Sequence, residues 1–452
     1  MIFIKKNYKY FFILLLCVFI NIVFRHRFYD GVTQYGMAHA IVMGETPYVD
    51  FSVVTTPLYL FLHALFLTLY DNFITFTIVN SIITTMTFYF AEKIIGKHIF
   101  TYFFLCLLPF FDVICPSYNL LAKLLLMIII YFEKEKKSDF SIGILLGLLI
   151  LSKHSVGGCI LLVSLLYRKE LKGIINRIKG VFIPCIIFLI YLLITKSLYE
   201  FIDLTVLGLF DFGKKNTLVS AFTITIFIVC LIVGIVCLIK GNKEHRYITY
   251  YAIGSLSFMI PIFDLNHASC TILFFYLLLF IREYPINYKY INIGLFMLLV
   301  LFGYKYYDIV YDDIYIHNFN HLPIYISGSN DYEEVLDYYE NKYPNSYMVD
   351  LDGVLYNIAS DKKITFLDIP LTGNYGHRGK KAIIEKLEKN KYYFISSLVF
   401  NYDFYQFDYD LCNYIIEHSE LVDSVSTYNI YYYKGWFIWK NIGLLFLVFF
   451  CF

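Results

Sequence analysis

The sequence predicts a polytopic α-helical membrane protein with about 12 spans, interfacial helices in its first outer loop, and a small α/β domain outside the membrane. Hydrophobic residues make up 59% of the 452-residue chain and charged residues only 16%, whereas a soluble domain is about half apolar and a quarter charged. Apolar runs recur over residues 1–304, polar and turn residues return over 305–434, and a last apolar run covers 435–452. These ranges are the predicted transmembrane domain, the α/β domain and a C-terminal transmembrane helix.

Charge and cysteine usage exclude several classes of protein. The formal net charge of +1 argues against nucleic acid as a partner. Nine of the ten cysteines lie in or beside hydrophobic runs, so neither a disulfide framework nor a zinc-binding cysteine spacing is predicted. Lysines precede residues 11–24 without a small-residue cleavage site after them. This first apolar run is therefore predicted to be a retained span.

The distribution of Lys and Arg orients the predicted spans, because these residues are retained on the cytoplasmic side. With the N-terminus in the cytoplasm, residues 25–72 form a long outer loop and the run EKEKK at 133–137 lies inside. Residues 305–434 then lie on the extracytoplasmic face of the plasma membrane. The predicted spans are residues 11–24, 73–91, 99–113, 120–132, 181–195, 218–239, 250–263, 271–281, 291–304 and 436–452.

The first outer loop is predicted to hold two short helices. Apolar residues from Tyr35 to Val42 repeat at helical spacing, and Gly44 with Pro47 is a stop signal. Residues 57–70 are apolar but number only 14. If they crossed the bilayer, about fifteen Lys and Arg would move to the outer side, against the positive-inside rule. They are interpreted as a second helix, lying in the interface.

Residues 140–167 form an apolar run that is too long, rather than too short, for a single span. One straight helix of this length would measure about 42 Å, too long for a ~30 Å hydrocarbon core, and would invert the later basic loops. A re-entrant hairpin that begins and ends inside satisfies the charge pattern, and its apex at 152–155 then lies below the outer surface. Irregular backbone at that depth is tolerated beside a protein-lined, wet cavity. This cavity is the candidate site.

Residues 305–434 alternate strand and helix patterns, which indicates a small α/β sandwich around a central sheet. About 130 residues suffice for an independent core. Strands are predicted at 322–327, 346–351, 363–369, 391–400 and 429–434, and helices at 331–343, 379–390 and 411–418.

Two acids of the first outer loop are candidate site residues. Asp30 follows the first span directly, where a carboxylate can take the proton of an attacking hydroxyl or amine. The alternative is that Asp30 caps the helix that follows. Asp50 is a candidate for substrate contact, and its alternative role is to close a turn.

The apex of the hairpin supplies Lys153 and His154. A lysine within the bilayer is costly unless it is paired or hydrated, and so it marks a site by default. A phosphate group would supply the partner charge. The alternatives are a lysine that snorkels to headgroups and a histidine without a role in the site.

Further candidates for substrate binding lie at the outer turns. Asp112 and Asn119 lie close to one turn, Asp264 and His267 lie at a later one, and Arg27 follows the first span. An acid and a histidine can orient a sugar or a phosphate, and an arginine can steer an anionic lipid. Capping of short loops and anchoring at the interface are the alternatives.

Several short motifs resemble the membrane-embedded glycosyltransferases of the GT-C fold, and most of all the bacterial relatives of protein O-mannosyltransferases and lipid A aminoarabinose transferases (family 39-like). In that family an acid follows the first span, and an A-x-x-x-x-x-G helix, a PY-x-D segment, a P-L helix and a G-L-x-x-L-x-K hairpin come after it. The matching positions here are Asp30, Ala38 to Gly44, Pro47-Tyr48 with Asp50, Pro57-Leu58, and Gly147-Leu148-Leu149 through Lys153.

The resemblance implies an inverting glycosyltransferase of the bacterial plasma membrane. It would move a sugar from a polyprenyl-phosphate donor to a glycan, lipid or protein acceptor of the cell envelope, with Asp30 as general base and the donor phosphate near Lys153. Relatives often carry Asp-Glu after the first span and an Asp at the second outer turn, where this chain has Gly31 and Asn119. A double-acid metal site is therefore not expected and no cofactor is implied, although a divalent metal stays open.

Two other classes of function stay open. A polysaccharide polymerase or ligase also has many spans and an outer domain, but relies on Arg- and His-rich outer loops, and the outer loops here hold few Arg. A flippase or transporter of lipid-linked sugars would show paired broken helices in matching halves. The sequence shows one broken hairpin and no inverted repeat.

Overall fold

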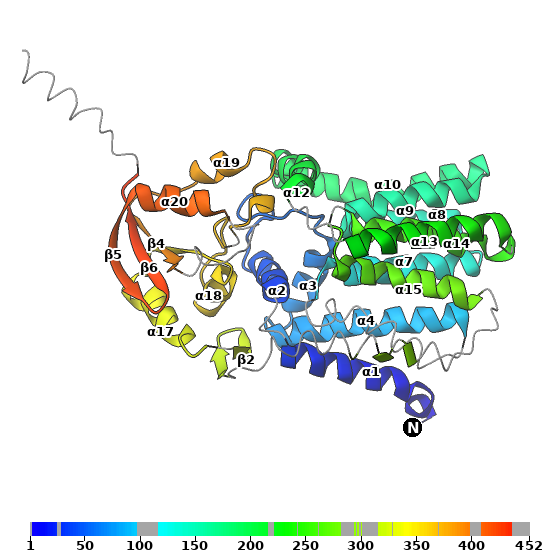
Figure 1. Ribbon diagram of the computed structural model, residues 1–452, viewed down its shortest axis with the longest axis horizontal. Helices are drawn as coiled ribbons and strands as arrows, with labels where there is room; N and C mark the ends of the chain where they lie inside the picture. Colours follow the sequence, from blue (N-terminus) through cyan, green and yellow to red (C-terminus); the bar gives the residue numbers. More distant parts are fainter. Residues whose placement is uncertain are drawn as a thin grey trace, which may run out of the picture.

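The computed structural model divides into a bundle of helices and an α/β domain at one end of that bundle (Figure 1). Some predicted features lie wholly or largely outside the described residues. They are the spans at 99–113, 291–304 and 436–452, and the candidate residues Arg27 and Asp112. The described residues are 2–24, 29–96, 116–215, 221–241, 243–260, 262–281, 293–294, 296–297, 300, 315–327, 329–368, 370–397 and 408–435.

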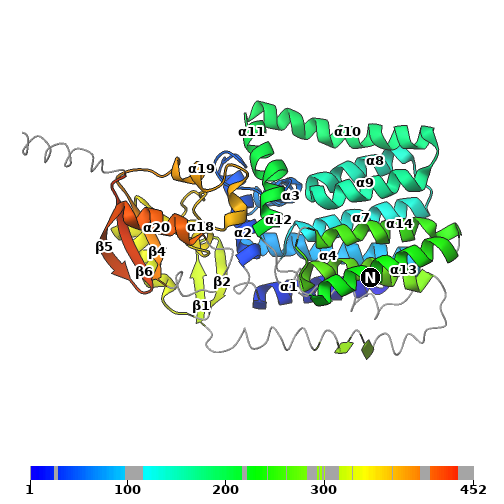
Figure 2. The ribbon, with the colours of Figure 1, turned by 45° about the horizontal axis from the view of Figure 1, so that its top comes forward.

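The helices of the bundle run side by side, and the chain begins at the end remote from the α/β domain (Figures 1 and 2). Three described helices, α4, α10 and α13, are long and apolar enough to cross a membrane, which supports membrane association. The total number of spans and their orientation stay predictions. The long elements are α1 Ile2–Phe24, α4 Phe73–Ile95, α7 Tyr118–Lys134, α8 Asp139–Ser152, α9 His154–Arg168, α10 Leu171–Ile194, α13 Ala221–Lys240, α14 Arg246–Ser255 and α15 Leu265–Ile281.

The broken hairpin predicted at 140–167 is confirmed as two packed helices, α8 and α9, of 14 and 15 residues. Lys153 alone interrupts them, with extended backbone angles of φ −149° and ψ 99°. The far ends of the two helices meet, because Arg168 Nε donates to both carboxylate oxygens of Asp139 at 3.0 and 2.9 Å. Each helix is only about 21–23 Å long at 1.5 Å per residue, so the break lies short of a full crossing.

Glycines bring α8 and α10 into close contact. A Cβ added to Gly143 would lie 2.1 Å from the carbonyl oxygen of Arg177, and one added to Gly147 would lie 2.5 Å from Pro184. Gly143 and Gly147 form a G-x-x-x-G pair, the spacing that lets membrane helices approach backbone to backbone. The glycine of the G-L-x-x-L-x-K motif thus has a packing role.

The helix α10 corrects one prediction. Residues 171–180 were expected to be a basic inner loop, but they form the first turns of α10, and Arg177 within them is only 1% exposed. Its guanidinium pairs with Glu133 at 2.7 Å and with Asp139 at 2.9 Å, and also bonds Ser164. Ion pairing with two carboxylates offsets the cost of burying this charge, so the helix continues where the sequence indicates a loop.

The first outer loop forms two helices as predicted, α2 Tyr29–Val42 and α3 Leu58–Leu67, both lying between the bundle and the α/β domain (Figure 1). One side of α3 is buried, whereas Leu65 and Phe66 are exposed. A second segment of short helices, which follows α10, was not predicted. It consists of α11 Leu198–Phe201, a wider π-helical turn at Ile202–Leu207, and α12 Gly208–Lys215.

The α/β domain is built on a four-stranded mixed sheet of order β3-β4-β6-β5 with a separate β1-β2 hairpin. β3 and β4 pair in parallel, and β6 pairs antiparallel with both β4 and β5. Its elements are β1 Tyr315–Phe319, β2 Leu322–Ser327, α17 Tyr332–Asp337 continued by Tyr338–Lys342, β3 Ser346–Val349, α18 Gly353–Ala359, α19 Lys380–Ile384, β4 Lys391–Ser396, α20 Tyr409–Glu417, β5 Ser419–Val425 and β6 Tyr428–Tyr433.

Two predictions for this domain are wrong in part. Residues 363–368 of the expected strand at 363–369 form a loop, and residue 369 lies outside the described residues. Asp368 accepts hydrogen bonds from the backbone and the hydroxyl of Thr365, and such local bonds compete with a strand ladder. The expected helix at 379–390 is reduced to α19. The strands β1 and β5 and the helix α18 were not predicted.

The α/β domain rests directly on α2. A Cβ added to Gly36 would lie 2.3 Å from a methyl carbon of Val354, so only glycine allows α18 to approach so closely. Val354 and Ile358 belong to the same buried cluster as the helices of the bundle, while the sheet has its own clusters on either side. The domain therefore has a core of its own and a second, shared one.

Candidate functional site

Lys153, the residue at the break between α8 and α9, contacts the start of α7. Lys153 Nζ donates to Asn119 Oδ1 at 2.9 Å and to the carbonyl oxygen of Phe258 at 3.4 Å. The amine also lies 5.6 Å from the ring centroid of Tyr118 and 5.3 Å from that of Phe258, within the range of cation–π attraction. Lys153 is 5% exposed and Asn119 7%, so this is a buried polar centre rather than a snorkelling lysine.

Neighbouring hydrogen bonds fix the backbone around the break. Ser152 Oγ donates to the carbonyl oxygen of Tyr118 at 3.3 Å, and Thr56 Oγ1 donates to the carbonyl oxygen of Ile150 at 2.9 Å. The last turn of α8 has carbonyl groups without helical partners, and Thr56 supplies a donor for one of them. The break is thus tied both to α7 and to the first outer loop.

Asp30 lies in the first turn of α2 and is exposed. A carboxylate there complements the positive end of the helix dipole, as the capping alternative requires. The residue after it, Gly31, would place a Cβ 3.4 Å from the side chain of Pro116, just before α7. Because Asn119 lies one turn further on, the beginning of α7 is the common neighbour of Asp30's helix and of Lys153.

A small cavity of about 50 Å³, partly open to solvent, lies between α2, the loop 51–55 and the α/β domain. Its polar lining comes from all three parts and from α7, and consists of Gln34, Ser52, Thr55, Tyr118, Thr365 and Asn374. Gln34 lies one helical turn after Asp30, and Tyr118 contacts Lys153. The rest of the lining is apolar and includes Met37, Phe51 and Leu60, so the neutral polar groups are a minority of its surface. A few polar groups in an apolar pocket can orient a small ligand.

The other predicted site residues have mostly local roles in the described structure. Asp50 Oδ2 accepts the backbone N–H of Thr46 at 2.6 Å, which closes a turn. Asp264 Oδ1 accepts the backbone N–H of His267 and contacts its ring, both at 2.7 Å, and so caps α15. Neither ring nitrogen of His154 has a hydrogen-bond partner among the described residues.

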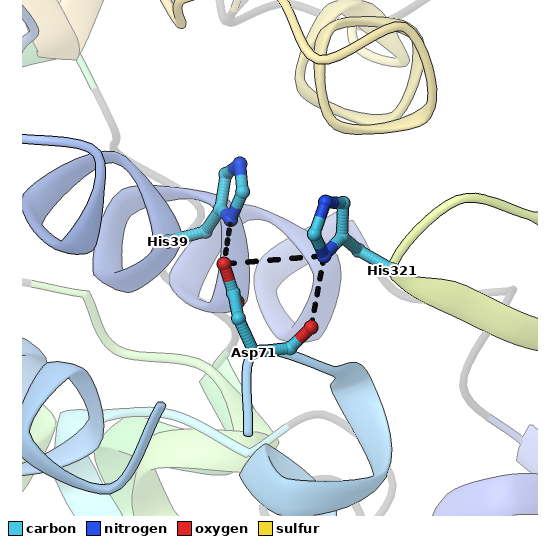
Figure 3. A group of neighbouring side chains, drawn as sticks. All are labelled: His39, Asp71 and His321. Atoms are coloured by element: carbon cyan, nitrogen blue, oxygen red, sulfur yellow. Dashed lines mark hydrogen bonds and ion pairs between the residues drawn. The ribbon is translucent and has the colours of Figure 1, made fainter. Parts of the chain in front are cut away.

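Three further polar groups were missed by the sequence analysis and come together across the domain boundary. His39 of α2, Asp71 before α4 and His321 of the β1–β2 turn place one ligand atom each within 4.8 Å of one another (Figure 3). The sequence carries no signal for this cluster, since 250 residues separate Asp71 from His321. Lys123, 3% exposed and one turn after Asn119 in α7, was also missed; its signal is a lysine within an apolar run.

The fold and the site define a helical, membrane-associated protein with an α/β domain covering one end of its bundle, and a polar centre beneath that cover. No family model, curated protein or solved structure matches this chain.

Proposed function

We propose that the protein is an inverting membrane glycosyltransferase with a GT-C-like architecture. It moves a sugar from a polyprenyl-phosphate donor to an acceptor of the cell envelope on the outer face of the plasma membrane. The observation that carries the proposal is the position of Lys153. The hairpin break, Asn119 and Phe258 hold this amine at the start of α7, at the end of the bundle that the α/β domain covers.

Lys153 is the group that would meet the donor phosphate. An ammonium group binds phosphate as a compact point charge, and its effect is largest where water is excluded. Asn119 and Phe258 orient the amine through neutral oxygen atoms. A bound phosphate would add an anionic partner to this polar centre.

Asp30 is the group that would act as general base. The acceptor oxygen or nitrogen attacks the anomeric carbon, and the bond from that carbon to the phosphate oxygen breaks. The lipid phosphate leaves with the electron pair, and Asp30 takes the proton of the acceptor. The neutral polar groups in the lining of the cavity, with Gln34 on Asp30's helix and Thr365 and Asn374 on the α/β domain, can orient a hydroxyl group of the acceptor.

The test uses the full chain in proteoliposomes loaded with a labelled polyprenyl-phosphate sugar and envelope extracts as acceptors. Asp30→Asn should abolish transfer while expression and insertion stay normal. Asp337→Asn is the control, because Asp337 is an exposed acid of the α/β domain that bonds Asn341 and has no place in the proposed site. Movement of label across the bilayer without bond cleavage would instead identify a flippase, and normal turnover by Asp30→Asn would remove Asp30 from the mechanism.

A further inference from the structure

We propose that His39, Asp71 and His321 form a binding site for one divalent transition-metal ion, Zn²⁺ being the best fit, which fastens the α/β domain to the first outer loop. The three residues come from α2, from the segment before α4 and from the turn between β1 and β2 (Figure 3). The site is separate from the polar centre around Lys153, and the proposal does not rest on the proposed function.

The ligand atoms are close to the spacing that zinc requires. His39 Nδ1 lies 2.7 Å from Asp71 Oδ2, and His321 Nδ1 lies 3.9 Å from the same oxygen. A tetrahedral zinc ion with bonds of 2.0–2.1 Å separates its ligand atoms by roughly 3.3–3.5 Å. The two observed distances bracket this value, so small side-chain rotations admit the ion. Two imidazoles and one carboxylate are typical zinc ligands.

Neighbouring side chains hydrogen-bond to two of the three proposed ligands, Asp71 and His321, and orient them. Tyr35 donates its hydroxyl to Asp71 Oδ1 at 3.1 Å, which leaves Oδ2 for the ion. His321 Nε2 lies 3.0 Å from Asp361 Oδ1, the carboxylate–histidine arrangement that usually supports a metal ligand. Asn320 in turn donates to the other oxygen of Asp361 at 2.7 Å. Each ligand side chain other than His39 thus has a fixed orientation set by a second residue.

All three side chains of the cluster are largely shielded from solvent, and His39 is the most deeply buried. His39 is 3% exposed, and the side chains of Asp71 and His321 are 18% and 22% exposed. The rings of the two histidines lie 4.8 Å apart. With three protein ligands, a fourth position stays open to water. His39 is not among the residues that line the cavity, to which α2 contributes Gln34 and Met37.

The location gives the ion a structural role. The backbone N–H of Phe73 donates to the carbonyl oxygen of His321 at 2.9 Å, and His321 Nδ1 lies 2.8 Å from the carbonyl oxygen of Asp71. These bonds already join the β1–β2 turn to the start of α4. An ion bound through His321 Nδ1 would replace the bond from that nitrogen to the carbonyl oxygen of Asp71, since a metal-bound nitrogen carries no proton. It would cross-link the same two parts and also α2.

The experiment measures metal directly on the full chain, purified in detergent with a tag that contains no histidine. After chelation and dialysis, the protein is titrated with Zn²⁺ and with Co²⁺; bound metal is measured by mass spectrometry, and the Co²⁺ absorption reports tetrahedral coordination. We expect one zinc per chain and a melting temperature that rises with zinc concentration. Chelated wild-type protein should melt at a lower temperature than reloaded protein, which tests the site without any substitution.

Variants localise the ion. His39→Gln, His321→Gln and Asp71→Asn should each lower bound zinc at least tenfold, and Asp71→Asn keeps an oxygen that can accept from His39. His418→Gln is the matched control, since this histidine of the same domain bonds the carbonyl oxygen of Tyr414, outside the cluster. Failure of wild-type protein to retain zinc, or equal zinc in all variants and the control, would overturn the proposal, and either result leaves the transferase assay unaffected.

Discussion

Lys153 donates a hydrogen bond of 2.9 Å to Asn119 across 34 positions of sequence, and this bond joins the break in the α8–α9 hairpin to the first turn of α7. Both residues are buried. The contact turns a short interruption of a helix into a fixed cationic centre at the covered end of the bundle. It is the geometric basis of the proposed donor site.

Lys153→Met should weaken use of the donor while insertion in the membrane stays normal. A hydrogen bond to a charged group is worth about 1.5–3 kcal/mol, so kcat/KM for the donor should fall roughly 10- to 100-fold. The measurement is steady-state transfer with varied donor concentration. Lys169→Met, which removes a lysine at the other end of the hairpin, should leave the donor dependence unchanged, and an equal loss in both variants would argue against a donor role.

Gly143→Ala should destabilise the bundle, because the new Cβ would lie 2.1 Å from the carbonyl oxygen of Arg177. Overpacking of this kind costs about 1–3 kcal/mol. Gly158→Ala, in the same hairpin, is the control, since a Cβ at Gly158 meets nothing within 4 Å. Thermal unfolding in detergent should show a lower melting temperature for the first variant alone; equal melting temperatures would mean that α8 and α10 are less closely packed.

Arg177→Met should be strongly destabilising, because it leaves Glu133 and Asp139 without their buried partner. Breaking a buried ion pair costs about 3–5 kcal/mol. Arg168 pairs with the same Asp139 but is 33% exposed, so Arg168→Met should cost about 1 kcal/mol or less. Denaturation midpoints of the two variants measure the difference, and similar midpoints would contradict the assignment of Arg177 as the main partner.

The stability of the α/β domain should fall as the pH rises from about 4 to about 7. Burial raises the pKa of the Asp368 carboxyl to about 7, and burial followed by the charge of Asp350 raises the pKa of Asp352 to about 7. These acids keep their protons in the folded protein at pH values where the unfolded chain has lost them. The contribution of these acids to the free energy of unfolding is complete below about pH 4. It decreases as the pH rises to the folded pKa of about 7, by no more than about 1.4 kcal/mol per pH unit for each group.

Asp368→Asn should flatten part of this pH dependence, since the amide is neutral at every pH and its oxygen can still accept from Thr365. Asp337→Asn is the control, because Asp337 is exposed and bonds Asn341. Melting temperatures recorded between about pH 5 and about pH 7 separate the two. A slope that Asp368→Asn leaves intact would assign the effect to other groups.

Local patterns predicted the elements nearest the site. The length of residues 140–167 and the charges around them predicted a hairpin with its apex at 152–155, and the structure breaks the helix at Lys153 within that range. Helical spacing and the stop signal predicted α2, and alternation predicted β4 and β6. Each of these depends on residues close together in sequence, which is the information that periodicity and capping carry.

The failures share a physical cause. Residues 363–368, expected to lie in a strand, form a loop because Thr365 bonds Asp368. The expected basic loop at 171–180 is helix because Arg177 pairs with two carboxylates from other helices. In both places the local pattern was outweighed by specific polar partners. A single sequence does not show which distant residue will satisfy a buried charge.

The sequence by itself predicted the membrane-associated character of this protein, the hairpin with its lysine, the position of Asp30 after the first apolar run and the alternation of the α/β domain, because apolar content, charge and spacing act locally. Only the tertiary structure decided that Asn119 meets Lys153, that a mainly apolar cavity lies between α2 and the α/β domain, and that His39 and Asp71 meet His321. These contacts depend on how whole helices and a domain pack against one another, since packing brings together groups that are as far apart in sequence as Asp71 and His321, which 250 residues separate, or farther.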